Sequence, residues 1–328
     1  TLEINNTTGA PVDYGTLSQT VSVPSSLIEG GAGPIDVTLS YAAGTAPAGT
    51  SNLTVTIAAA STLNAIQLDM NAGLGNDNLG VLMADFSLDS DGGASSTAVQ
   101  VRIIGGGIPD REFGDGVHDF LYLPVTSTTG EVWLNNNLGA DYANINHASF
   151  DLSQQATSLT DPLAYGSTYQ WGRYSDGHEI RTSGAIGTTN ATTAVPNTGG
   201  AWEGLFITEP NSPYDWLTTP DPKLWKVVSG TNNPCPSGYR LPTETEWETE
   251  RTAWGSNNAA GAFTSLKLPV AGFRGSSNGA LTDVGSDGFY WSSAVRDPNA
   301  RALNFDSSFA IMRSRSRAFG YSVRCIQD

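Results

Sequence analysis

The feature that most constrains this chain is its pair of cysteines, Cys235 and Cys325, the only two among 328 residues. They admit three roles: a disulfide, a pair of metal ligands or a redox-active pair. No Cys-x-x-Cys spacing occurs and the chain has only three histidines, so a zinc site would lack clustered ligands. We therefore expect a structural disulfide closing a loop of about ninety residues, worth roughly 4 kcal/mol if unstrained.

Composition limits the partners of the chain. The net charge is −16 although only 15 % of residues are charged, because lysine and arginine are scarce. Such a surface repels phosphate groups, so we expect no nucleic-acid partner. No apolar run reaches about 18 residues, which predicts no membrane span. Paired cysteines suit an oxidising compartment. Because the sequence begins with Thr1, we expect a mature exported protein, secreted or on the extracellular cell surface, that has lost a targeting segment.

Residues 1–110 are predicted to form an all-β domain, an immunoglobulin-like sandwich. Apolar and small polar residues alternate over 35–41, 53–57 and 98–104, which is the period of half-buried strands. Glycine- and proline-rich turns separate these segments. The segment 58–66 is ambiguous between strand and helix.

Residues 111–328 are predicted to form an α+β domain with little helix. Seven of the eight tryptophans follow residue 170, which indicates a loop-rich domain held by aromatic packing. The one good helix candidate is 243–253, where Thr243 and Glu246 form a capping box. Arg240 is expected to meet a buried carboxylate.

Six phrases in order give this second domain a family resemblance. They are EVWLNNNL (131–138), YGSTYQWG (165–172), CPSGYRLPTETEW (235–247), LPVAGFR (268–274), FYWSS (289–293) and SVRCI (322–326). The set resembles the Fibrobacter succinogenes major paralogous domain over about residues 115–328. That family is frequent in exported proteins of Bacteroidetes and related bacteria.

The resemblance implies a C-type-lectin-like or formylglycine-generating-enzyme-like fold and an export habit. It implies no single activity, because function sits in loops that vary over such a scaffold.

A lectin-like tripeptide offers one candidate ligand site. Glu209-Pro-Asn211 spells the carbohydrate-binding motif of C-type lectins, in which Glu and Asn hold calcium and sugar hydroxyls. Here it lies before Cys235 instead of in a late loop, and no Trp-Asn-Asp partner follows. A proline-containing surface turn explains the same residues.

Two acidic turns offer weak calcium candidates, with Asp89, Asp91 and Asp115 as ligands. Neither turn follows the twelve-residue EF-hand pattern, and solvated turns explain both. No cofactor is otherwise indicated.

Polar loops and an arginine row offer candidate recognition surfaces. The loops 276–287 and 296–301, with Arg296 and Arg301, flank the Trp-Ser-Ser strand. Arg313, Arg315 and Arg317 would share one face of a strand. They would meet carboxylates of the same chain or of a neighbouring subunit.

The leading hypothesis is a non-enzymatic surface protein, either an adhesin or the structural subunit of an extracellular filament. No P-loop or dinucleotide motif occurs, and a polar turn explains His178 between its acidic neighbours. Residues 1–11 would add a strand to another copy of the chain or form the first strand of their own domain. The alternative function is a glycan-binding module, with or without calcium, whose partner is a surface glycan or protein.

Overall fold

The computed structural model describes residues 2–6, 10–14, 17–23, 35–53, 56–59, 81–90, 95–104, 107–187, 190–195 and 199–328. Contacts divide the chain into two compact units, Thr1–Gly106 and Gly107–Asp328. The expected boundary at residue 110 lies four residues beyond this division. Across the described residues the chain is predominantly β-structure with two α-helices, and none of its helices is long and apolar enough to cross a membrane.

The first unit is built of antiparallel strands, as the alternating segments predict. Its described strands are β1 (Leu2–Asn6), β2 (Val12–Tyr14), β3 (Leu17–Val23), β4 (Ile35–Tyr41), β5 (Gly44–Ala46), β6 (Gly49–Leu53), β7 (Thr56–Ala59), β8 (Val81–Ser90) and β9 (Ser95–Ile104). The predicted strand 35–41 matches β4, and 98–104 falls within β9. Of the predicted strand 53–57, residue 53 ends β6 and residues 56–57 begin β7, while residues 54–55 lie outside the described residues. Of the ambiguous segment 58–66, residues 58–59 end β7 and the rest lies outside the described residues.

The described strands of this unit form three sheets, with the orders β1-β6, β5-β2-β8-β9 and β3-β4-β7. The longest pairing joins β8 to β9, from Val81 opposite Ile104 to Ser90 opposite Ser95. β1 pairs with β6, with Leu2 opposite Leu53. The first residues of the chain therefore form a strand of their own unit.

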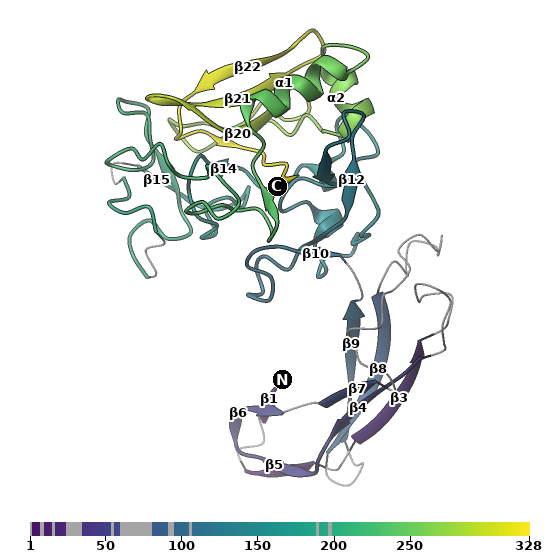
Figure 1. Ribbon diagram of the computed structural model, residues 1–328. Coiled ribbons are helices and arrows are strands. Elements are labelled where there is room, and N and C mark those ends of the chain that lie inside the picture. Colours follow the sequence, from purple (N-terminus) through teal and green to yellow (C-terminus); the bar gives the residue numbers. More distant parts are fainter. Residues whose placement is uncertain are drawn as a thin grey trace. The chain divides into compact units, whose positions relative to one another are not determined.

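The second unit consists of short strands, long loops and two helices (Figure 1). Its strands are β10 (Ile108–Pro109), β11 (Leu121–Tyr122), β12 (Pro124–Thr126), β13 (Val132–Leu134), β14 (Tyr169–Gln170), β15 (Ala185–Gly187), β16 (Phe206–Thr208), β17 (Tyr239–Arg240), β18 (Phe273–Arg274), β19 (Leu281–Thr282), β20 (Gly288–Arg296), β21 (Asn299–Phe305), β22 (Ala310–Arg315), β23 (Gly320–Tyr321) and β24 (Ile326–Gln327). Two single turns of 3-10 helix, η5 (Asp141–Ala143) and η6 (Pro162–Ala164), lie in the loops.

The sheets of this unit join segments that are far apart in sequence. Their orders are β12-β13-β24-β17, β14-β23-β18-β19, β20-β21-β22, β10-β11 and the parallel pair β15-β16. β24, at the end of the chain, lies between β13 and β17.

Helix α1 (Glu244–Ala253) begins where the sequence predicts. The Thr243 hydroxyl accepts the N–H of Glu246, and the Glu246 carboxylate accepts the N–H of Thr243. This reciprocal pair satisfies two donors that a helix start leaves open. The same carboxylate binds Arg240, with a nitrogen–oxygen distance of 2.8 Å. That partner is partly exposed and not buried as expected.

Helix α2 (Ala259–Leu266) was not anticipated from the sequence. It is short, contains Gly261 and lacks a capping box, so its local signal is weak. Asn258 caps it by accepting the N–H groups of Ala260 and Gly261. Packing fixes this helix, since Ala262 and Leu266 are buried in the core.

Tryptophans form the centre of the second unit. Trp171, Trp225 and Trp291 lie in one apolar cluster, and Trp133 and Trp247 lie in another. Three of them donate their indole N–H groups to backbone carbonyls: Trp171 to Ser292, Trp247 to Trp291 and Trp291 to Tyr169. The rings therefore contribute apolar area and also fix the strands that carry those carbonyls.

Buried arginines join segments that are far apart in sequence. Arg324 donates to the side-chain oxygen of Asn137 and to the carbonyls of Leu134 and Leu266. Arg274 donates to the carbonyls of His178, Ile180, Ser183 and Gly279. A guanidinium has five donors, so one side chain pins several loop carbonyls at once.

Candidate functional site

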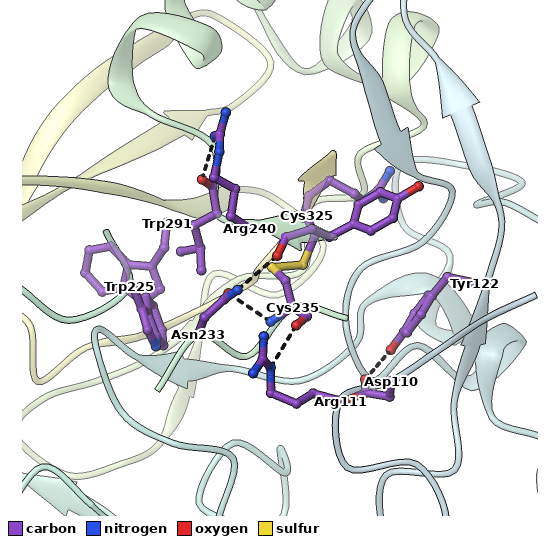
Figure 2. Close-up of a disulfide and its surroundings, with 12 residues drawn as sticks. Asp110, Arg111, Tyr122, Trp225, Asn233, Cys235, Arg240, Trp291 and Cys325 are labelled. Carbon is purple, nitrogen blue, oxygen red and sulfur yellow. Dashed lines mark hydrogen bonds between the residues drawn. A yellow bond between two sulfur atoms is a disulfide. The ribbon is translucent and has the colours of Figure 1, made fainter. Parts of the chain in front are cut away.

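The two cysteines form the expected disulfide. Cys235 and Cys325 are bridged and fully buried. Figure 2 shows the segments that meet there: Arg111 donates through Nε to the Cys235 carbonyl, and Asn233 accepts the Cys235 N–H. The bridge therefore fastens the loop after β10 and the last strand to one point. Because both sulfurs are bonded to each other, neither offers a free thiol for metal binding or redox chemistry.

The strongest candidate site is a pocket of about 590 Å³ in the second unit. Its walls come from three loops: residues 112–118, 174–183 and 203–204. Four carboxylates line it, those of Glu112, Asp115, Asp176 and Glu203. The pocket is thus an acidic cavity built from loops, the part of a scaffold where ligands usually bind.

His118 joins the first of these loops to the second. Its Nδ1 lies 2.6 Å from Asp115 Oδ2, and its Nε2 lies 2.7 Å from Glu179 Oε1. Since both ring nitrogens face carboxylates, both donate and the ring is an imidazolium. Burial opposes this charge, but the hydrogen bonds and charges of Glu179 and Asp115 outweigh it and raise the pKa of His118 to about 9. The first pocket loop is therefore held by an ion pair to a buried carboxylate.

Glu179 is that buried carboxylate, only 1 % exposed. Burial disfavours its ionised form, but hydrogen bonds from His118 and His178 outweigh burial and hold the pKa of Glu179 well below its usual range. Its Oε2 also accepts the N–H of Gly177 at 3.0 Å. The carboxylate thus stays charged and organises the loop that carries it.

His178 lies beside the same carboxylate in a different state. The N–H of Gln170 donates to its Nε2 at 3.2 Å, so that nitrogen is an acceptor and the proton sits on Nδ1. Nδ1 lies 2.7 Å from Asp176 Oδ1 and 3.2 Å from Glu179 Oε2. Asp176 also pairs with Arg173 at 2.7 Å.

Asp176, His178 and Glu179 bring three potential metal ligands within 4.8 Å of one another. A cation at Nδ1 would displace the proton that binds Asp176, and it would be repelled by Arg173 and by the His118 imidazolium. The three residues therefore fit an internal ion-pair network better than a metal centre.

A second buried acid lies behind the first pocket loop. Asp110 accepts the Tyr122 hydroxyl at 3.0 Å, a contact visible in Figure 2. Burial raises the pKa of Asp110 to about 6, although the positive charge of His118 opposes that rise. Folding therefore favours the protonated form of Asp110, whereas it favours the ionised form of Glu179.

Glu209 and Asn211, the lectin-like pair, lie in a turn after β16. Glu209 Oε1 accepts the N–H of Asn211 at 2.8 Å, and its Oε2 accepts the Asn190 amide at 3.2 Å. The Glu209 carboxylate thus closes its own turn, while Asn211 is exposed. Neither residue lines the pocket.

The candidate arginines of the late loops have different surroundings. Arg296 is exposed at the end of β20. Arg301 lies on β21 and donates to Glu244 at 2.8 Å, to the Ser314 hydroxyl and to the Met312 carbonyl. Arg301 therefore fastens α1 to the β20-β21-β22 sheet and has little freedom to meet a ligand.

The predicted arginine row is only partly a strand face, because β22 ends at Arg315. Arg313 is exposed and lies over the Phe309 ring at 5.3 Å. Arg317 is buried and pairs with Asp215 at 3.2 Å and with Asp297. Partners within the chain thus account for Arg317.

Of the calcium candidates, Asp115 is the one whose side chain the structure describes. Its Oδ1 accepts the N–H groups of Val117 and His118, and its Oδ2 pairs with the His118 ring. Asp89 lies in β8 opposite Ser96, and Asp91 lies outside the described residues.

The network around Glu179 was missed from the sequence. His118 and Glu179 are 61 residues apart in the sequence, and no local sequence pattern encodes such a pairing. One signal was present: two of the three histidines follow an Asp-Gly pair, in DGVH (115–118) and DGHE (176–179). A histidine next to an acidic turn therefore occurs in two of the three pocket loops, 112–118 and 174–183.

The family model described as "Domain of unknown function (DUF8237)" matches residues 250–326. The match begins within α1, covers β20, β21 and β22, and includes Cys325 but not Cys235. No curated protein and no solved structure matches the chain.

Proposed function

We propose that this chain is an exported, non-catalytic surface protein, either an adhesin or the structural subunit of an extracellular filament. One observation carries the proposal: the reactive side chains described in the second unit serve to hold its loops. Both cysteines are bridged. The imidazoles of His118 and His178 bind carboxylates of the loops themselves.

The proposed fold of each unit agrees with such a role. We propose an immunoglobulin-like sandwich for the first unit and, from its family resemblance, a C-type-lectin-like scaffold for the second. Such a scaffold presents variable loops on a rigid base. A base fastened by a disulfide and buried guanidinium groups suits a protein that works outside the cell.

Subunit contacts through β-strands are the proposed mode of assembly. β1 and β6 form a two-stranded sheet among the described strands. A two-stranded sheet has an outer edge on each strand, and such edges accept a further strand from another molecule.

Sedimentation velocity of the purified chain over a range of concentrations tests the assembly. We expect species larger than the monomer, and electron microscopy should show extended particles. Ile4→Pro should abolish them, because proline removes a strand donor and disfavours β1, whereas Ile4→Thr keeps a β-branched residue and should preserve them. A monomer at all concentrations would contradict the proposal.

The glycan-binding alternative depends on Asn211, which is exposed beside the turn that Glu209 closes. Glycan-array binding that disappears with a chelator and with Asn211→Ala would favour it.

A further inference from the structure

The acidic pocket contains more negative than positive charge. Glu112, Asp115, Asp176 and Glu203 line it, and Glu179 lies directly behind His118. The positive charges in direct contact with these carboxylates are the His118 imidazolium and Arg173. The field inside therefore favours a cation.

Two of the carboxylates are available to a ligand. Glu112 accepts a hydrogen bond from the Tyr174 hydroxyl, and Glu203 accepts the N–H of Gly199. In the described part of the chain neither forms an ion pair, in contrast to Asp115 and Asp176. Each carboxylate has about four lone-pair sites, so one hydrogen bond leaves capacity for a charged donor.

The shape and rim of the pocket favour a long organic cation over a bare ion. Val117 and Ile180 stand at the rim with 49 % and 39 % of their surface exposed, and Tyr174 adds an aromatic ring. An apolar rim around an acidic interior matches a side chain with an aliphatic stem and a charged end. A guanidinium also presents several donors in a fixed plane, which suits carboxylates on separate loops.

We propose that this pocket binds an arginine side chain from a second copy of the chain. The inference depends on the proposed assembly and specifies one of its contacts. Arg296 and Arg313 are exposed on the β20-β21-β22 sheet. In Figure 1, β10, which precedes the first pocket loop, lies at the opposite end of the second unit from β22. A contact between two different surfaces of one chain is head-to-tail, and such contacts build a filament when the rotation between copies does not close into a ring.

The pocket is tested with Nα-acetyl-L-arginine amide as a probe, by NMR titration of the full chain. We expect saturable shifts at the amides of Gly177 and Gly204. The neutral isostere Nα-acetyl-L-citrulline amide should cause none. The double variant Glu112→Gln/Glu203→Gln should weaken probe binding roughly tenfold or more. Glu131→Gln, at an exposed turn outside the pocket, should leave it unchanged.

Equal binding of citrulline, or undiminished binding by the double variant, would overturn the pocket assignment. Saturation of the same shifts by calcium alone, with no effect of the probe, would overturn it in favour of a metal site.

Sedimentation separates this inference from the proposed assembly. Arg296→Glu/Arg313→Glu and excess probe should both reduce self-association of the chain. Self-association that neither affects would overturn the arginine contact and leave the assembly standing. If the chain binds the probe but stays monomeric at all concentrations, the arginine does not come from a second copy, and the proposed assembly is also wrong.

Discussion

Two regions of the second unit are held in different ways. Around Cys235 and Cys325 the chain is fixed by a covalent bond and by buried tryptophans such as Trp225 and Trp291. Around the pocket it is fixed by charges, with His118 between Asp115 and Glu179. The disulfide sulfurs and the indole rings of the first region do not ionise near neutral pH, whereas the imidazole of His118 in the second region does. We infer that the disulfide stabilises its region at every pH near neutrality, whereas the ion pairs that hold the pocket loops weaken when His118 loses its proton.

The largest predicted effect comes from removing the segments that pair with the C-terminal strand. A fragment of residues 250–328, close to the family match, should show no cooperative unfolding. In the whole chain, β24 pairs with β13 and β17, and Arg324 binds Leu134 and Asn137. The fragment contains β24 and Arg324 but lacks these four partners. A fragment of residues 107–328 should unfold cooperatively in urea, as judged by circular dichroism. Equal cooperativity in both fragments would contradict this dependence.

Removing the buried charge at the pocket should have the next largest effect. Glu179→Gln leaves the His118 imidazolium without its buried partner, and breaking such a pair costs about 3–5 kcal/mol. Tryptophan fluorescence during urea unfolding measures this, because all eight tryptophans lie in the second unit. The exposed control Glu131→Gln should change the unfolding free energy by less than about 0.5 kcal/mol.

Opening the disulfide should cost about 2–4 kcal/mol, mainly by freeing a long loop in the unfolded chain. The double variant Cys235→Ser/Cys325→Ser and chemical reduction of the natural chain should lower the fluorescence midpoint alike. The loss should be the same at pH 6 and pH 9, unlike that of Glu179→Gln. A pH-dependent loss would erase the contrast between the two regions.

A smaller effect is expected from pH alone. The pKa of His118 is raised from 6.5 to about 9 in the folded chain, so its stabilisation is complete below pH 6.5 and is lost as pH rises through 9. The pKa of Glu179 is lowered, so its contribution is complete above pH 4.5 and is lost in stronger acid. Asp110, with a pKa of about 6, favours folding only when protonated, and that gain fades as pH approaches 6.

Between pH 7 and 9.5, His118 is the group among these three whose charge changes most, because Asp110 and Glu179 are almost fully ionised above pH 7. Stability should therefore fall by about 1–3 kcal/mol over that range. In His118→Gln the stability should be nearly constant over the same range.

Local patterns predicted the parts of the fold that local forces determine. The capping box at Thr243 placed the start of α1, because both of its hydrogen bonds join residues three apart. The two cysteines indicated their own pairing, since no other cysteine competes. Helix α2 escaped notice because its burial against the core, and not its own sequence, stabilises it. The pocket escaped for a similar reason: Glu179 meets His118 only after the loops fold together.

The most direct test of the central claim is an NMR titration of the imidazole rings of His118 and His178. Nitrogen shifts should show His118 protonated on both nitrogens at pH 7.5, losing a proton only near pH 9. At the same pH, His178 should be protonated on Nδ1 alone, as its acceptor contact with Gln170 requires. A His118 ring that is neutral at pH 7.5 and titrates near 6.5 would show that no ion pair holds the pocket loops.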